Sequence, residues 1–193
     1  MIAFIAALLS TASVLAAYTT TQVVIVQPWS QGQLKSSMRV TERRTGNCWG
    51  NSLVSDRRTA WRCMAGNDIY DPCFSDPQRP RTVACVAGPF SNNVALMTLT
   101  KALPGSPDAV DTIGELHNLR LRGQPWGLQL TDGETCTFMT GATDVVHGER
   151  LNYACTKRFA IGLPYRSSSA WEIKTVPGLH GNVESFGVAE AVF

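Results

Sequence analysis

The segment Trp126-Gly-Leu-Gln-Leu-Thr-Asp-Gly-Glu-Thr-Cys-Thr-Phe138 carries the clearest local indication of the fold. Asp132-Gly133 separates two short apolar runs, a pattern typical of a β-hairpin. A two-residue loop would divide the apolar side chains between both faces of the hairpin. A three-residue loop with a left-handed Gly133 instead pairs Leu128 with Cys136 and gathers the apolar side chains on one face. We therefore predict the register with a three-residue loop, which also pairs Trp126 with Phe138.

Similar strand patterns occur on both sides of this hairpin, in short runs rich in apolar and β-branched residues. They lie at residues 23–26, 38–42, 81–86, 94–99, 151–155, 170–176 and 184–192. The run at 151–155 is a plausible neighbour of the hairpin. The predicted fold class is mainly β (α+β): a disulfide-stapled, antiparallel, sandwich-like sheet domain with one or two short helices.

Two segments favour helices. Ser55 or Asp56 can cap a helix that ends near residue 67, because either side chain can accept a hydrogen bond from a free amide of the first turn. In that helix Ala60 and Met64 would lie four residues apart on one face. Residues 101–125 contain several glycines and prolines and favour loops. A short helix is expected to begin there at Ser106-Pro107, where serine caps and proline takes the first helical position.

The beginning of the chain resembles an export signal. Residues 1–17 carry no charged side chain and include an apolar run at residues 2–9. That run is shorter than the roughly 20 residues of a membrane-spanning helix. Val14 and Ala16 have the spacing of a signal-peptidase site. We predict a signal peptide over residues 1–16 and one extracellular globular domain over residues 17–193, without a membrane span; a buried N-terminal helix is the alternative.

The cysteines agree with export. Six cysteines in an exported chain indicate three disulfides, and short sequence separation favours Cys48–Cys63, Cys73–Cys85 and Cys136–Cys155. The pattern alone leaves the connectivity open. A zinc site is the weaker interpretation, because the chain has no C-x-x-C pair and its histidines lack ligand spacing. We expect no metal and no cofactor.

Basic and acidic side chains nearly balance. The chain has 17 Lys and Arg against 15 Asp and Glu, for a formal charge of +2. This balance favours neither nucleic acid nor an anionic membrane surface as a partner, and we expect no nucleic acid to bind. With 44% hydrophobic residues, the chain can build a substantial core, and its length suits one domain.

Gly46-Asn-Cys-Trp49 resembles the end of the signature around the catalytic cysteine of papain-like proteases. His180 follows at the spacing that this family uses, and Asn182 is nearby. The resemblance implies a Cys48 thiolate as nucleophile, His180 as its base and Asn182 as the orienting residue. Thr45 stands where the family has another cysteine, and a disulfide would remove the nucleophile. Because of these departures, a secreted cysteine hydrolase is only the alternative function, and a non-catalytic binding domain is preferred.

Carboxylate pairs are a second enzymatic possibility. Asp68 with Asp71, or Asp132 with Glu134, could serve a glycosidase, which needs two carboxylates at the scissile bond. Turn formation explains Asp132 and local capping explains Asp71, so we assign neither pair to catalysis.

Aromatic and basic residues suggest a binding surface instead. Trp29 and Trp49 lie in polar, turn-like contexts and are candidates for exposed stacking platforms, whereas most other tryptophans suit the core. Arg57, Arg58 and Arg62 on the predicted helix could add contacts to an anionic group.

Three cysteine-containing segments carry a resemblance: Gly46-Asn-Cys-Trp, Ala60-Trp-Arg-Cys-Met-Ala-Gly-Asn and Ile69-Tyr-Asp-Pro-Cys-Phe. With residues 126–130, 136–142 and 150–155, they are similar to a group of uncharacterised bacterial exported proteins. The resemblance implies a secreted or cell-envelope location and brings no activity with it. The sequence thus favours a secreted, non-catalytic monomer that binds an extracellular or cell-envelope ligand, with residues 48–85 as the expected functional surface.

Overall fold

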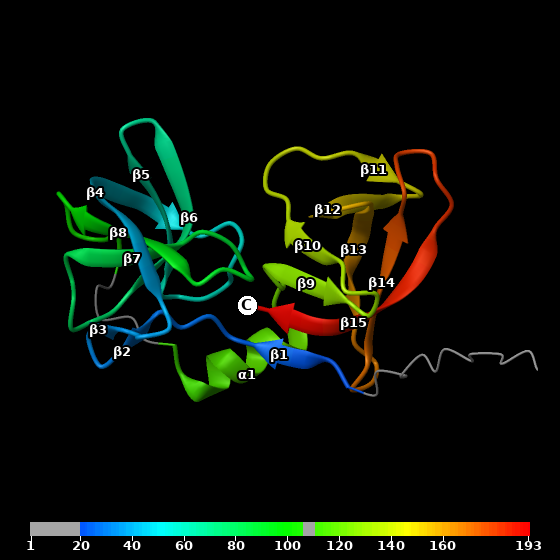
Figure 1. Cartoon of the computed structure of the whole chain (residues 1–193), viewed down its shortest axis with the longest axis horizontal. Helices are drawn as coiled ribbons and strands as arrows, with labels where there is room; N and C mark the ends of the chain where they lie inside the picture. The colour runs from blue at the N-terminus through cyan, green and yellow to red at the C-terminus, as the bar shows by residue number, and fades with distance from the viewer. Residues whose placement is uncertain (1–19, 106–110) are drawn as a thin grey trace, which may run out of the picture.

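The computed structural model describes residues 20–105 and 111–193. They form two closed β barrels side by side, with one helix running below both (Figure 1). The elements are β1 (Gln22–Val24), β2 (Trp29–Ser30), β3 (Gln33–Leu34), β4 (Arg39–Asn51), β5 (Ala60–Ala65), β6 (Asp68–Ser75), β7 (Thr82–Val86), β8 (Asn93–Leu99), α1 (Ile113–Arg122), β9 (Gly127–Leu130), β10 (Thr135–Phe138), β11 (Val145–Val146), β12 (Glu149–Cys155), β13 (Phe159–Tyr165), β14 (Trp171–Val176) and β15 (Glu184–Val192). The mainly β fold with a short helix is confirmed.

The first barrel consists of β4 to β8. Consecutive strands pair antiparallel, and a parallel pairing of β8 with β4 closes the ring. The strand predicted at residues 38–42 is the beginning of β4, which continues through the glycine- and asparagine-containing segment that follows. This strand is long because its first part pairs with β8 and its last part pairs with β5.

The helix predicted from Ser55 to residue 67 is wrong, because residues 60–65 form strand β5. Trp61, Cys63 and Ala65 point into the barrel and are buried, whereas Arg62 and Met64 point outward. Alternation with a period of two therefore describes this segment better than the four-residue spacing on which the helix rested. Pairing with both β4 and β6 fixes it as a strand.

The second barrel consists of β9, β10, β12, β13, β14 and β15. These strands pair in that order, and β15 also pairs with β9, which closes the ring. The three-residue hairpin register is confirmed: Leu128 is paired with Cys136, and Gly133 has a φ of 86°. Strand β1 extends this sheet by a parallel pairing with β15.

Each disulfide joins two residues that face each other on neighbouring strands. The pairs are Cys48–Cys63 between β4 and β5, Cys73–Cys85 between β6 and β7, and Cys136–Cys155 between β10 and β12. These are the pairs that sequence separation favoured. All six cysteines are used, so the chain has no free thiol.

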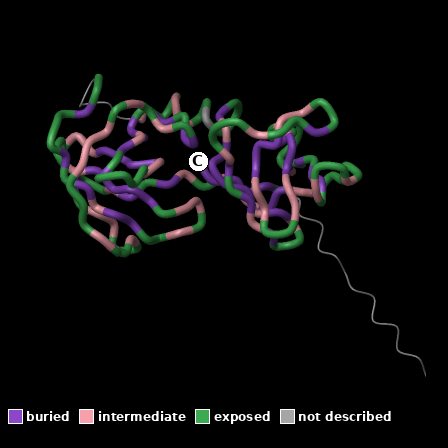
Figure 2. The backbone as a smooth tube through the Cα atoms, turned by 90° about the horizontal axis from the view of Figure 1, so that it is seen from above, coloured by how far each residue is buried: buried purple, intermediate pink, exposed green. Residues whose placement is uncertain are grey.

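The two barrels share one hydrophobic cluster. Phe74 and Val94 reach it from the first barrel, and Trp126, Leu128 and Tyr153 reach it from the second. A second cluster fills the first barrel alone. Buried segments accordingly continue across the junction of the barrels in Figure 2. The junction is therefore part of the core.

Helix α1 begins with a capping box. The Thr112 amide donates to Glu115 Oε2 at 2.8 Å, and the Glu115 amide donates to Thr112 Oγ1 at 3.2 Å. The helix start predicted at Ser106-Pro107 lies outside the described residues. Within the described chain, no helix has the length and apolar character to cross a membrane.

Candidate binding groove

A cavity of about 360 Å³ opens between the two barrels. Its first wall is the outer face of β5 and β6. Its second wall is formed by the end of β10 and by Thr140, two residues after that strand. The β7–β8 loop closes one side. The lining residues are Val54, Arg62, Ile69, Asp71, Ala87, Gly88, Pro89, Trp126, Thr137, Phe138 and Thr140. We call this cavity the inter-barrel groove.

Arg62 and Asp71 are the charged residues of the groove lining. Arg62 Nε lies 4.0 Å from Asp71 Oδ2, too far for a hydrogen bond. In the described part of the chain this buried Nε has no hydrogen-bond partner. The Arg62 side chain is nevertheless 31% exposed, so part of it faces the groove beside the carboxylate.

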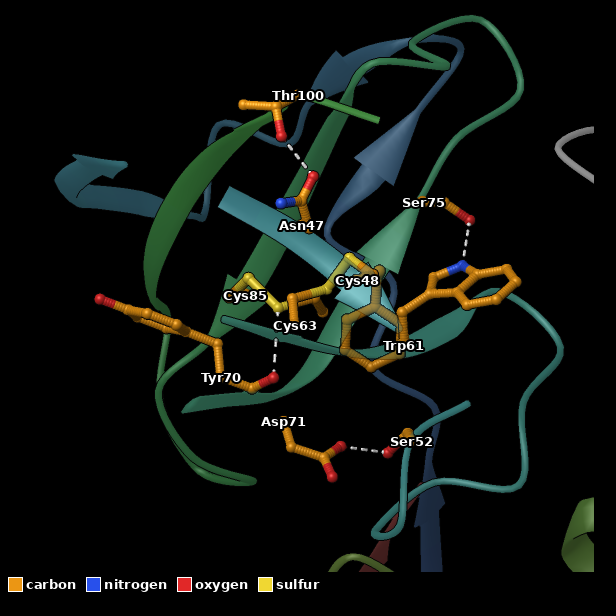
Figure 3. Close-up of a disulfide and its surroundings, with 12 residues drawn as sticks. Asn47, Cys48, Ser52, Trp61, Cys63, Tyr70, Asp71, Ser75, Cys85 and Thr100 are labelled. Carbon is orange, nitrogen blue, oxygen red and sulfur yellow. Dashed lines mark hydrogen bonds between the residues drawn. A yellow bond between two sulfur atoms is a disulfide. The ribbon is translucent and has the colours of Figure 1, made fainter. Parts of the chain in front are cut away.

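Asp71 is held in place by the loop after β4. Its Oδ1 accepts from the Ser52 hydroxyl at 2.5 Å, and its Oδ2 accepts from the Leu53 amide at 3.0 Å. Figure 3 shows the Asp71 carboxylate directed toward Ser52. Burial raises the pKa of Asp71 above its ordinary value, and these hydrogen bonds together with Arg62 offset only part of that effect.

Trp49 stands next to the groove and is 47% exposed. The Arg62 guanidinium lies over its ring, 5.4 Å from the centroid, in a cation–π contact. Met64 and Ile69 face each other on β5 and β6 of the same outer face, and both are exposed. An aromatic platform, a cation and two apolar side chains thus lie together on neighbouring strands.

The second wall adds hydroxyl groups to an aromatic floor. Thr137 and Thr140 are exposed residues at the end of β10 and just after it, while Phe138 and Trp126 are buried beneath them. Neither threonine was predicted from the sequence to belong to a site. Since the groove is formed only when the barrels meet, no local pattern around these residues indicates it.

Sequence analysis proposed Trp29, Trp49, Arg57, Arg58 and Arg62 as ligand-binding residues. The structure places Trp49 and Arg62 together at the groove and the other three near the beginning of α1. The cause of this separation is that residues 60–65 form a strand rather than the continuation of a helix.

Arg57 is occupied by contacts within the protein. Its guanidinium donates to Asp111 Oδ2 from Nε at 2.9 Å and from Nη2 at 2.6 Å, and both side chains are buried. It also donates to the Val26 carbonyl and lies over the Phe74 ring. The Thr59 hydroxyl donates to the same Asp111 oxygen at 2.7 Å. This network attaches the start of α1 to the first barrel.

Arg58 and Trp29 also have partners in the protein. Arg58 pairs with Glu115 of α1 at 3.1 Å, and the Trp29 indole donates to the Phe74 carbonyl at 2.8 Å. Both contacts fasten loops to the first barrel or to the helix. A ligand role for Arg58 and Trp29 stays a prediction, and no contact described for them favours it.

The cysteine-hydrolase arrangement is not assembled. Cys48 is bonded to Cys63 and carries no thiolate. His180 and Asn182 are exposed in the loop between β14 and β15, in the second barrel, and on the opposite side of Figure 1 from β4. The proposed nucleophile and its base therefore belong to different barrels.

The carboxylates of both proposed pairs have partners within the protein. Asp68 is exposed and lies 3.8 Å from Arg44, whereas Asp71 faces the groove. In the hairpin, Asp132 and Glu134 both pair with Arg158, at 2.9 and 2.8 Å. Among residues 20–105 and 111–193, no three His, Cys, Asp or Glu side chains are grouped to hold a metal ion.

Comparison with protein-family models, with curated proteins and with solved structures gave no match.

Proposed function

We propose that the chain is an exported, non-catalytic binding domain that holds a cell-envelope ligand in the inter-barrel groove. The observation that carries this proposal is the Arg62–Asp71 pair, set in an open cavity beside the half-exposed Trp49. Ligand sites combine a concave surface with a few fixed polar groups and aromatic contacts. Three disulfides and the leader pattern support export.

The composition of the groove supports binding over hydrolysis. Its described lining contains a single carboxylate, Asp71, and neither histidine nor thiol. A glycosidase of the usual kind needs two carboxylates across the scissile bond, and a cysteine hydrolase needs a thiolate beside a base. The residues that line the groove can hold and orient a ligand, whereas neither hydrolytic mechanism finds its partners there.

The test is retention of the exported protein by cell envelopes of the producing organism. The native protein should sediment with the envelopes, and Trp49→Ala and Arg62→Ala should each release most of it. Tyr165→Ala and Arg43→Ala are the matched controls, because Tyr165 is 68% exposed on the second barrel and Arg43 is exposed on β4 away from the groove. Equal retention of the native protein and the two groove variants would contradict the proposal.

A second measurement addresses export itself. The protein recovered from outside the cell should begin at or next to residue 17 by N-terminal sequencing, and thiol titration without reductant should find no free cysteine. Recovery only inside the cell with an intact leader would count against export.

A further inference from the structure

We infer that the ligand of the inter-barrel groove is an uncharged carbohydrate chain, held by the Arg62–Asp71 pair and by Thr137 and Thr140 while a sugar ring stacks on Trp49. This inference rests on the proposed function, because it names the ligand class of the same groove. It depends on three properties of the described groove: its charge, its hydrogen-bonding groups and its aromatic surface.

The charges of the groove cancel. Arg62 and Asp71 carry opposite charges 4.0 Å apart, and the rest of the described lining is uncharged. An anionic ligand would meet the Asp71 carboxylate as soon as it reached Arg62, and a cationic ligand would meet Arg62 next to Asp71. Like charges at that range are unfavourable. The pair therefore selects a ligand that has no net charge of its own.

The polar groups of the groove match hydroxyls. The part-exposed Arg62 guanidinium presents donors, and Asp71 presents acceptor oxygens. Thr137 and Thr140 on the other wall can donate or accept. A hydroxyl group does both as well, so neighbouring hydroxyls of a sugar can accept from Arg62 and donate to Asp71. Charge-assisted hydrogen bonds of this kind are the strong ones.

The aromatic surface matches the other face of a sugar. A pyranose ring has an apolar face of C–H groups and a rim of hydroxyls. Trp49 offers an exposed aromatic surface next to Arg62, whose guanidinium fixes the indole by the cation–π contact. An aromatic platform that is already ordered loses little conformational freedom on binding.

An extended peptide fits this wall less well. Peptides that add to a sheet hydrogen-bond to the main chain of a free edge strand. The groove wall is instead the outer face of β5 and β6, which presents the side chains of Arg62, Ile69 and Asp71. Side-chain recognition of a hydroxylated ring suits this geometry better.

The experiment treats the cell envelopes before the exported protein is added. Periodate cleaves vicinal diols of sugars, so envelopes oxidised and then freed of periodate should lose most of their capacity for the native protein. Proteinase-treated envelopes should keep it. Soluble neutral pentasaccharides of 4-linked glucose, mannose and xylose, whose units carry vicinal diols, are then tested as competitors, and at least one of them should displace the protein from untreated envelopes.

Variants connect the result to the groove. The double variant Thr137→Ala/Thr140→Ala should bind the competing sugar about tenfold more weakly, which is the effect of losing two hydrogen bonds. Trp49→Ala should weaken binding about tenfold or more, as expected for a central aromatic contact. Thr98→Ala is the matched control, because Thr98 is exposed on β8 and outside the groove lining.

The outcomes separate the two proposals. Binding that proteinase abolishes and periodate spares identifies a protein partner; it overturns the carbohydrate inference and leaves the proposed function in place. Displacement by oligogalacturonate in preference to every neutral sugar overturns the uncharged class. If untreated envelopes retain the native protein and Trp49→Ala equally, the proposed function itself fails.

Discussion

Asp71 is the carboxylate with the most unusual surroundings at the scale of single residues. Burial raises its pKa, and Ser52, the Leu53 amide and Arg62 oppose that shift without cancelling it. The native state therefore binds this proton more tightly than the unfolded chain does. The proton stabilises the native state at low pH, and the stabilisation is lost as the pH rises through the raised pKa.

Asp71→Asn removes this titration and retains a side chain that can accept from Ser52. The unfolding free energy of the native protein, minus that of the variant, should fall as the pH rises from the ordinary carboxyl pKa through the raised one. Above that range the difference should become constant. Urea unfolding of both proteins at a series of pH values measures it. A difference that rises with pH would contradict the assignment.

Arg57 and Arg58 are neighbours in the chain with unequal energetic roles. The Arg57–Asp111 pair is buried, so Arg57→Ala leaves an uncompensated carboxylate and should lower the unfolding free energy by about 3–5 kcal/mol. The Arg58–Glu115 pair is exposed, and Arg58→Ala should cost about 0–1 kcal/mol. Denaturant unfolding compares the two variants. Similar losses for both would show that the buried pair is not a main anchor of α1.

Part of the candidate site could be predicted from single residues of the sequence. Trp49 could be singled out because it lies in a polar, turn-like context, and Arg62 because it is one of the arginines that follow, although the helix assigned to them is wrong. Asp71 was dismissed as a capping residue, and Thr137 and Thr140 were missed, because their importance arises only where the barrels meet. The prediction for Arg57 rested on a helix shared with Arg62, and its actual partner Asp111 is too distant in sequence to be found from a local pattern.

At the scale of elements, the hairpin of β9 and β10 was predictable and β5 was not. The hairpin is specified locally by Asp132-Gly133 and by the apolar face of its register. β5 has a possible cap before it and apolar residues at both helical and strand spacings, so local rules disagree. Its pairing with β4 and β6 decides between them, and those partners are not visible locally. The pairings that close the barrels, β4 with β8 and β9 with β15, join strands distant in sequence and could not be predicted from local patterns either.

At Gly127 of β9 the β7–β8 loop of the first barrel lies so close that a side chain would disturb it. A Cβ at this position would lie 2.4 Å from Pro89 Cβ in the β7–β8 loop. Gly127→Ala should therefore push this loop away and lower the unfolding free energy by about 1–3 kcal/mol. Gly50→Ala is the matched control, because nothing lies within 4 Å of its Cβ position. Denaturant unfolding checks the pair, and equal stability of both variants would contradict the close approach.

At the scale of the whole molecule, the shared hydrophobic cluster makes each barrel part of the other's core. Unfolding one barrel would expose Trp126, Leu128 and Tyr153, or Phe74 and Val94, which the other barrel normally covers. This exposure carries a large hydrophobic cost. The two barrels are therefore expected to unfold together.

A single cooperative transition is the expected result of heating or of adding denaturant. Tryptophan fluorescence and far-ultraviolet circular dichroism should follow the same curve, and the calorimetric and van't Hoff enthalpies should agree. Phe74→Leu in the first barrel should shift the whole transition to lower temperature. Two separate transitions, with only one of them shifted by Phe74→Leu, would show that the barrels are independent.

The disulfides reinforce each barrel against mechanical load but do not reinforce the junction between the barrels. Every bridge joins adjacent strands of one barrel, and all six cysteines are used in this way. No disulfide crosses the junction where the groove lies, so in the described part of the chain the barrels are joined there by their shared hydrophobic cluster and by the connecting backbone. Under the proposed function, a pull on the bound ligand would act first on this unbridged junction, and because the core is shared, opening the junction would destabilise both barrels at once.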